Sequence, residues 1–342
     1  MQYARLGDYV NIKTGKLDAN AAVENGQYPF FTCSKEISSI DSYSYDTECV
    51  LVAGNGDLNV KYYNGKFDAY QRTYIIENKE NSIFYVKYIY YFMSRYILEL
   101  KKQTVGGIIK FIKLGNLTEA KIPIYSKEKQ KDIIDFFDNF NSAITNKIHE
   151  LEILDNLIKS QFIEMFGDPL INPMKWKIEE LYKNANVITG NTPPRADVSN
   201  YGDYLEWIKT DNIIENATYP SIAKEYLSEI GAQIGRSAPS GSILMACIAG
   251  SISSIGRVCL LDRKVAFNQQ INAIVPVNYS SRFLLHLLKN SKDYLICDVN
   301  MALKGILSKS MLENKEFIIP PKPLQDQFAA IVEQIDKSKF IT

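Results

Sequence analysis

The sequence has no excess of charge of either sign and little of the chemistry on which enzymes depend. Its 342 residues include 39 basic and 39 acidic side chains, two histidines and five scattered cysteines. Two histidines are too few for a histidine-rich metal site or a triad, and no two cysteines stand at metal-ligand spacing. We therefore expect no metal site, reduced and mostly buried cysteines, and a cytoplasmic protein.

Several other patterns are absent. No stretch reaches the roughly 18 apolar residues of a membrane span, and residues 1–10 lack the apolar core of a signal peptide. Neither a GxxxxGK[ST] loop nor a GxGxxG turn after a strand occurs, which disfavours a nucleotide enzyme. The proline pairs at 193–194 and 320–321 lack the neighbours with which an adenine methyltransferase surrounds a flipped base. We predict a soluble chain with no catalytic residues.

What the sequence does contain is a repeat. Gly15 follows Ile-Lys-Thr and Gly190 follows Val-Ile-Thr, and four further segments recur in the same order. These segments pair residues 49–53 with 242–246, 69–72 with 266–269, 107–109 with 305–307, and 122–124 with 319–321, followed by Gln130 with Gln327. The order indicates a duplication, with insertions early in the second copy. Chain length and an apolar content of 46% allow each copy its own core.

A long helix is predicted between the copies. Residues 127–166 contain no proline or glycine, and their apolar residues recur about every 3.6 positions. At about 1.5 Å per residue such a helix is roughly 60 Å long, and Gly167 and Pro169 end it. Residues 323–342 begin the same pattern for about 20 residues. One face of the long helix therefore needs a partner.

The predicted fold class is α+β. Strand composition marks 49–53, 73–76, 243–248 and 258–261, whereas 84–102 and 281–294 have helical patterns. We expect a first domain in residues 1–125, a spacer helix in 126–168, a second, similar domain in 169–322, and a shortened second spacer helix in 323–342. The second helix is expected to pair antiparallel with the first.

The charges are unevenly distributed between these parts. Residues 126–166 carry five basic and eight acidic side chains and residues 323–342 carry two and three, so the helices hold −4 and the two domains +4. DNA-binding proteins use such lysines and arginines for phosphate contacts. Ordinary scatter of surface charge explains so small an excess equally well.

Loop side chains supply candidates for DNA contacts. Arginine, asparagine and glutamine can form paired hydrogen bonds with guanine or adenine edges, and lysine and arginine can hold phosphates. In the first copy the candidates are Lys16, Lys35, Asn55, Lys61, Gln71, Arg72 and Lys110. In the second copy they are Asn191, Arg195, Lys209, Arg257, Asn268, Gln269, Gln270 and Lys304.

The ordered motifs of the chain resemble those of a known family. Leu6-Gly7-Asp8 opens the first copy, Met165-Phe166-Gly167-Asp168-Pro169 ends the long helix, and the second copy contains Gly190-Asn191-Thr192-Pro193, residues 207–211 (WIKTD) and residues 268–272 (NQQIN). In this order they are similar to the specificity subunits of type I restriction-modification systems. The resemblance spans nearly the whole chain.

This resemblance implies a set of partners. Each domain would read one half of a split double-stranded DNA site, and the helices would set the distance between the halves. Two methylating subunits would bring S-adenosylmethionine, and motor-nuclease subunits would complete the complex. The chain itself would bind no cofactor. The short second helix also allows self-association through the long helices, or completion of the helix pair by another polypeptide.

Two other classes of function remain open at this point. A structural adaptor would use the helices to pair with another chain and the domains to bind protein. The Glu-x-Lys pairs at Glu77 with Lys79 and at Glu313 with Lys315 could be fragments of a metal-dependent nuclease site, although this pattern is common by chance.

Overall fold

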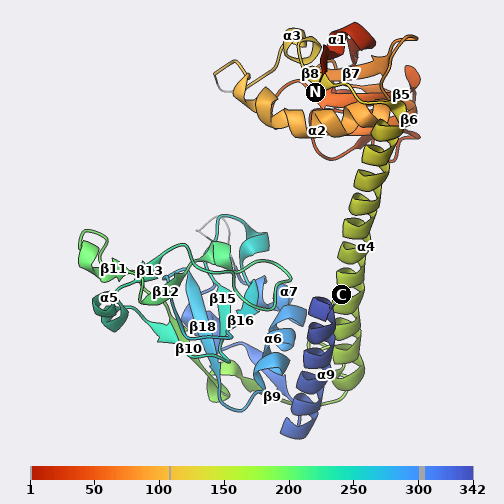
Figure 1. Ribbon diagram of the computed structural model, residues 1–342. Helices are drawn as coiled ribbons and strands as arrows, with labels where there is room; N and C mark the ends of the chain where they lie inside the picture. Colours follow the sequence, from red (N-terminus) through yellow and green to blue (C-terminus); the bar gives the residue numbers. More distant parts are fainter. Residues whose placement is uncertain (1, 108, 300–304, 342) are drawn as a thin grey trace. The chain divides into compact units, whose positions relative to one another are not determined.

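The computed structural model describes residues 2–107, 109–299 and 305–341, and the chain divides into two compact units, residues 1–147 and 148–342. Both units combine helices with sheets, so the α+β prediction is confirmed (Figure 1). Among the described residues, no helix is long and apolar enough to cross a membrane.

A six-stranded sheet forms the body of the first unit. Its order is β2-β7-β5-β6-β3-β4. The strands are β2 (Val10–Thr14), β3 (Tyr28–Phe31), β4 (Ser38–Ile40), β5 (Tyr45–Ala53), β6 (Val60–Ala69) and β7 (Thr73–Asn78). All neighbours run antiparallel except β3 and β6, which are parallel. Because strand side chains alternate between faces, Val50 and Val52 pack with helix α2 (Val86–Lys102), whereas Cys49 and Leu51 fill a second cluster with Phe67.

Short elements surround this sheet. They are β1 (Tyr3–Arg5), α1 (Leu6–Tyr9), η1 (Ala19–Ala21), α3 (Leu114–Thr118) and β8 (Lys121–Pro123). Strands β1 and β8 pair antiparallel and bring the two ends of the domain together, next to the start of helix α4. Helix α4 spans Lys127–Phe166, which confirms the predicted long helix.

The second unit contains two larger sheets and a short pair. The pair is β9 (Lys177–Glu180) with β19 (Glu316–Ile319). One sheet has the order β10 (Ala185–Thr189), β18 (Ile271–Pro276), β15 (Ile243–Ala246), β16 (Val258–Leu260). The other has the order β11 (Tyr201–Gly202), β13 (Tyr226–Leu227), β12 (Leu205–Ile208), β17 (Val265–Phe267), β14 (Ser237–Ala238). The helices are η2 (Leu181–Lys183), η3 (Val198–Asn200), η4 (Thr210–Asn212), α5 (Glu229–Ile234), η5 (Ile252–Ser254), α6 (Ser281–Asn290), α7 (Lys292–Ile296), α8 (Lys309–Glu313) and α9 (Lys322–Ile341).

Helix α9 packs antiparallel against the second half of α4 (Figure 1). The rings of Phe166 and Phe328 lie 5.5 Å apart near the start of α9, and Lys339 near its end binds Asp155 at 2.7 Å. Later residues of α9 therefore contact earlier residues of α4, so the two helices run antiparallel. The predicted antiparallel pairing is confirmed, and its apolar seam is continuous with the core around Phe283 of α6.

The two copies share a set of backbone hydrogen bonds. Tyr70 N donates to Phe31 O at 2.9 Å and Asn268 N to Ile208 O at 3.0 Å. These two donors begin equivalent turns, residues 70–73 and 268–271. The last residue of each turn accepts a second bond: Gly15 N donates to Thr73 O at 3.1 Å, and Gly190 N donates to Ile271 O at 3.0 Å. Ala69 therefore corresponds to Phe267, one position beyond the Ala266 that sequence similarity selects. When insertions separate the copies, similarity of residues does not determine which positions correspond, whereas backbone pairing does.

In each copy, the segment that follows strand β2 or β10 passes so close to this turn that it needs a glycine there. A Cβ on Gly15 would lie 2.0 Å from the carbonyl oxygen of Ala69, and one on Gly190 would lie 2.2 Å from that of Asn268. Both distances are far inside van der Waals contact. The glycines recognised as a repeated motif are therefore required by close backbone approach.

Candidate nucleic-acid interface

In the first unit, the predicted DNA-contacting residues gather at one end of the six-stranded sheet. Backbone bonds join their loops: Gln71 N donates to Leu17 O at 2.9 Å, Gly54 N to Arg72 O at 2.8 Å, and Gly56 N to Lys110 O at 3.0 Å. The residues that meet there are the exposed Lys16, Lys35, Gln71, Arg72 and Lys110 and the partly buried Asn55 and Lys61. Residues far apart in sequence thus form one polar cluster, in which all but Lys61, a residue of β6, lie outside the strands of the sheet.

These side chains differ in how freely they could meet a ligand. Gln71 and Arg72 have no side-chain hydrogen bond to any residue that the structure describes, so their donors face solvent. Lys61 instead donates to Ser34 O at 2.6 Å, and burial lowers the pKa of its ammonium group. We therefore interpret Lys61 as a support for the 32–36 loop.

In the second unit, two predicted base-reading amides bind other groups of the same unit. Asn191 donates to Ile234 O at 3.0 Å and accepts from Arg236 N at 2.7 Å. Asn268 is only 6% exposed and donates to Gln270 Oε1 at 3.1 Å. These contacts hold the loops in place, and base contacts by these amides stay a prediction. Gln269 is exposed and accepts a short hydrogen bond from the Thr192 hydroxyl, whereas Lys304 lies outside the described residues.

A recurring feature of both units is a carboxylate that binds two cations. Asp57 binds Lys35 at 3.1 Å and Lys101 at 3.3 Å. Glu215 binds Lys292 at 3.0 Å and Arg257 at 3.2 Å. Glu225 binds Lys209 and, at 2.7 Å, Arg195. Each group keeps one net positive charge.

The electrostatics agree with this geometry. Hydrogen bonds from Lys209 and then from Arg195 lower the pKa of Glu225, and those from Lys35 and Lys101 lower the pKa of Asp57. The sequence alone does not indicate that these carboxylates bind the cations. Lys209 and Glu225 are 16 positions apart, so no local spacing connects them.

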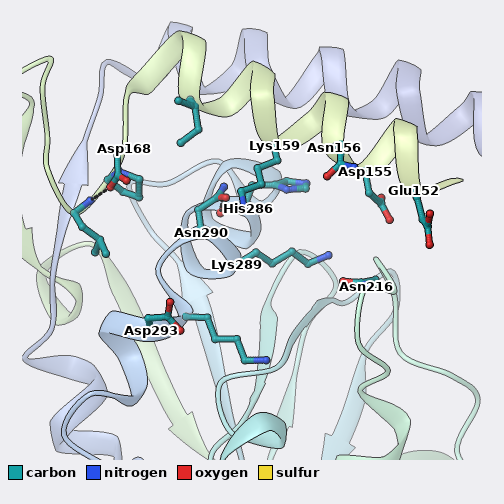
Figure 2. A pocket seen from close by; sticks show the side chains of 14 residues that line it. Glu152, Asp155, Asn156, Lys159, Asp168, Asn216, His286, Lys289, Asn290 and Asp293 are labelled. Atoms are coloured by element: carbon teal, nitrogen blue, oxygen red, sulfur yellow. Dashed lines mark hydrogen bonds between the residues drawn. The ribbon is translucent and has the colours of Figure 1, made fainter. Parts of the chain in front are cut away.

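A cavity of about 550 Å³ lies within the second unit, between α4 and α6 (Figure 2). Its lining includes three lysines, among them Lys289, which reaches toward Asn216, and four carboxylates. Burial lowers the pKa of Lys289, and it lowers that of His286 to about 3, so this imidazole is neutral near pH 7. With four carboxylates against three lysines on its wall, the cavity does not select an anion such as phosphate.

The two Glu-x-Lys pairs do not form a metal site among the described residues, and no cluster of metal-binding side chains occurs there. Glu77 binds Lys13 at 2.9 Å, while Lys79 donates to Gly7 O at 2.8 Å. In the other pair, Glu313 binds Lys309 at 3.4 Å and Lys315 binds Asp298 at 2.7 Å.

Comparison with known proteins agrees with the repeat and the fold. Residues 1–155 and 173–342 match the family described as the type I restriction modification DNA specificity domain. The chain belongs to this family. The resemblance noted in the motifs is thereby confirmed, and the two matched segments correspond to the two copies.

Individual relatives carry the same description. The chain is 37% identical over 154 residues to the type I restriction enzyme EcoDI specificity subunit of Escherichia coli, a match covering 45% of this chain and 34% of that protein. It is 23% identical over 274 residues to the MjaIX specificity subunit of Methanocaldococcus jannaschii, covering 73% and 62%. The matches thus span about one third and three fifths of these relatives.

The fold also has a solved counterpart. The crystal structure of a type I restriction-modification S subunit from M. genitalium is similar with a TM-score of 0.66 at 14% identity, covering 99% of this chain and 90% of that one. At this identity the likeness establishes the fold alone.

Proposed function

We propose that this chain is the DNA-reading subunit of a type I restriction-modification complex and that each unit reads one half of a split duplex target. The observation that carries the proposal is the repeated loop cluster. Matched backbone bonds place Gln71 and Arg72 in the first copy at the positions of Gln269 and Gln270 in the second. All four side chains can form paired bonds with base edges.

We further propose that the chemistry belongs to partner subunits in the cytoplasm. Two methylating subunits would carry S-adenosylmethionine and modify the DNA, and motor-nuclease subunits would cut it. This chain would bind no cofactor or metal and would act by placing its partners on the target. Support comes from membership of the specificity family and from relatives named as subunits of restriction enzymes.

The long helix offers a surface for such partners. In the first unit, Phe136, Phe140 and Ile144 on α4 are 65%, 55% and 44% exposed. A run of large apolar side chains at helical spacing is typical of a face that packs against another helix. We propose that a helix of another chain in the complex covers it, and the molar mass of the isolated chain tests whether that helix comes from a second copy.

Selection from a random duplex library tests the reading function directly. The full chain, in complex with its methylating partner, should enrich a motif in two parts with a fixed gap at both low and moderate salt. Sequence-blind binding that disappears with salt would contradict the proposal and favour the adaptor, because phosphate contacts alone are strongly salt-dependent.

Two double variants test which unit reads which half of the DNA target. The double change Gln71→Ala with Arg72→Ala should relax one half of the motif, and Gln269→Ala with Gln270→Ala the other, so each pair is the control for its counterpart. Loss of both halves with either pair would contradict the assignment of one unit to each half.

A further inference from the structure

The guanidinium group of Arg195 has an unusual setting. It lies 4.7 Å from the ring centre of Tyr201 and 4.9 Å from that of Trp207, and one of its nitrogens binds Glu225 at 2.7 Å. Trp207 is buried, at 3% exposure, and its indole N–H donates to Asn191 O at 3.3 Å. The floor beneath the guanidinium is therefore rigid.

Lys209 contacts the same carboxylate and the same tryptophan ring. Its ammonium group binds Glu225 and lies 5.2 Å from the ring centre of Trp207. Two positive groups from separate loops are thus fixed next to one another. Their side chains keep 53% and 33% of their surface exposed.

Two other described arginines of the second unit are held by different groups. Arg263 binds Glu206 with two nitrogens and Asp262 with the third, so all three guanidinium nitrogens already donate to carboxylates. Arg236 donates to Thr189 O at 2.9 Å. Arg195 has the Glu225 contact on one corner and no other hydrogen-bond partner among the residues that the structure describes.

We propose that Arg195 and Lys209, positioned by Glu225 on the Trp207 floor, bind one phosphate of the DNA backbone without reading a base. This inference rests on the proposed function. The Arg195 nitrogens that do not bind Glu225 keep free N–H donors on a side chain that is 53% exposed, where a phosphate of the DNA backbone can reach them. Base edges lie inside a groove and require a side chain that projects into it. Fixed orientation lowers the entropy cost of the contact.

In the described part of the first unit, the positions that match Trp207 and Lys209 hold neither a tryptophan nor a lysine. Backbone pairing places Phe30 at the position of Trp207 and Thr32 at that of Lys209, because Phe30 and Phe31 pair with β6 as Trp207 and Ile208 pair with β17. The proposed contact therefore belongs to the second unit, and it accounts for two candidates whose role the sequence left open between phosphate and guanine.

The test is binding of the complete complex to its selected target and to an unrelated duplex over a series of salt concentrations. Arg195→Gln should weaken binding to both duplexes by the same factor, roughly tenfold. It should also reduce the slope of log affinity against log salt by about one. Lys224→Gln removes the same charge from an exposed neighbour of Glu225 and should change the slope much less.

A double-mutant comparison tests the role of Glu225. In a Glu225→Gln background, Arg195→Gln should cost less affinity than in the unmodified chain, because the guanidinium is no longer held. Additive losses would show that Glu225 does not position Arg195. Thermal unfolding of each variant identifies any loss that comes from misfolding, and Arg195→Lys, which keeps the charge, should restore most of the salt slope.

The outcomes separate this inference from the proposed function. Loss of preference at one base of the target with an unchanged slope would show that Arg195 reads a base, and no change at all would show that it makes no contact. Either result overturns the phosphate assignment while the split motif stands. If the unmodified complex selects no split motif, the proposed function itself fails.

Discussion

Gln130 and Gln325 occupy the same structural position in the two copies, although sequence similarity pairs Gln130 with Gln327. Gln130 Oε1 accepts from Tyr85 N at 3.0 Å just before α2, and Gln325 Oε1 accepts from Ser280 N at 2.9 Å just before α6. Both amides are buried, at 0% and 1% exposure, and donate to backbone carbonyls, those of Ile83 and Tyr125 in the first copy and that of Pro320 in the second. Each fastens a long helix to its domain.

Replacing either glutamine should destabilise its own unit. Gln130→Ala or Gln325→Ala leaves buried backbone groups without partners, which costs about 1–3 kcal/mol of unfolding free energy. Urea unfolding followed by circular dichroism measures the loss. Gln327→Ala, at an exposed neighbour, is the matched control. A larger loss for Gln327 than for Gln325 would contradict the structural pairing.

The repeated glycines should not tolerate a methyl group. Gly15→Ala and Gly190→Ala place a Cβ within about 2 Å of backbone oxygens, so we expect a loss of about 3 kcal/mol or more, or failure to fold. Gly115→Ala in α3 has open space around the new methyl and should be neutral or slightly stabilising. The yield of folded protein and the denaturation midpoint check both expectations.

His286 should make the second unit sensitive to acid. Its pKa in the folded state is lowered to about 3 by burial, whereas an unfolded histidine titrates near 6.5. Between these values only the unfolded state binds the proton, so stability falls as pH falls. The expected slope approaches 1.4 kcal/mol per pH unit.

The comparison that isolates this effect uses His286→Gln and, as a control, His149→Gln, whose side chain is 72% exposed. Unfolding free energies at pH 6 and pH 5 should differ less in His286→Gln than in the unmodified chain or in the control. Equal differences in all three proteins would show that folding does not lower the pKa of His286.

Cysteine reactivity should follow burial. Burial raises the pKa of the Cys49, Cys247 and Cys259 thiols to about 12, so almost no thiolate forms at pH 8. Cys297 is exposed and should react first with iodoacetamide, followed by the half-buried Cys33. Mass spectrometry of the intact chain should show two modifications under native conditions and five in denaturant. Early labelling of Cys247 would contradict its burial directly after β15.

The exposed apolar face of α4 in the first unit should be needed for assembly of the complex and not for folding of the chain. Changing Phe136, Phe140 and Ile144 to serine removes exposed apolar surface, so the isolated chain should keep its helical content and gain solubility. Capture of the methylating partner should be lost if that subunit supplies the covering helix. Light scattering on the isolated chain shows whether the same change also abolishes a dimer.

The sequence by itself determined the long helix, the duplication and the family. Apolar spacing without proline or glycine predicts residues 127–166, and α4 has these bounds, because a helix depends on neighbours three and four positions away. Strands predicted at 49–53 and 73–76 lie within β5 and β7, because their β-branched and apolar residues favour extended backbone. The sequence also indicated most candidate cations, which lie in loops rich in polar residues and glycine, whereas Lys61 lies in β6.

Tertiary structure alone decided how those parts combine. Backbone bonds within each copy set the register of the repeat, and they match Tyr70 with Asn268, 198 positions later. Sequence similarity pairs Ala69 with Ala266, which is off by one, because it does not detect these bonds. Asn268 has the chemistry of a base reader, yet its amide is buried against Gln270. Glu225 unites Arg195 and Lys209 only because β12 and β13 pair next to the 190–197 loop. Long-range backbone pairing chooses such partners, and no local pattern records that choice.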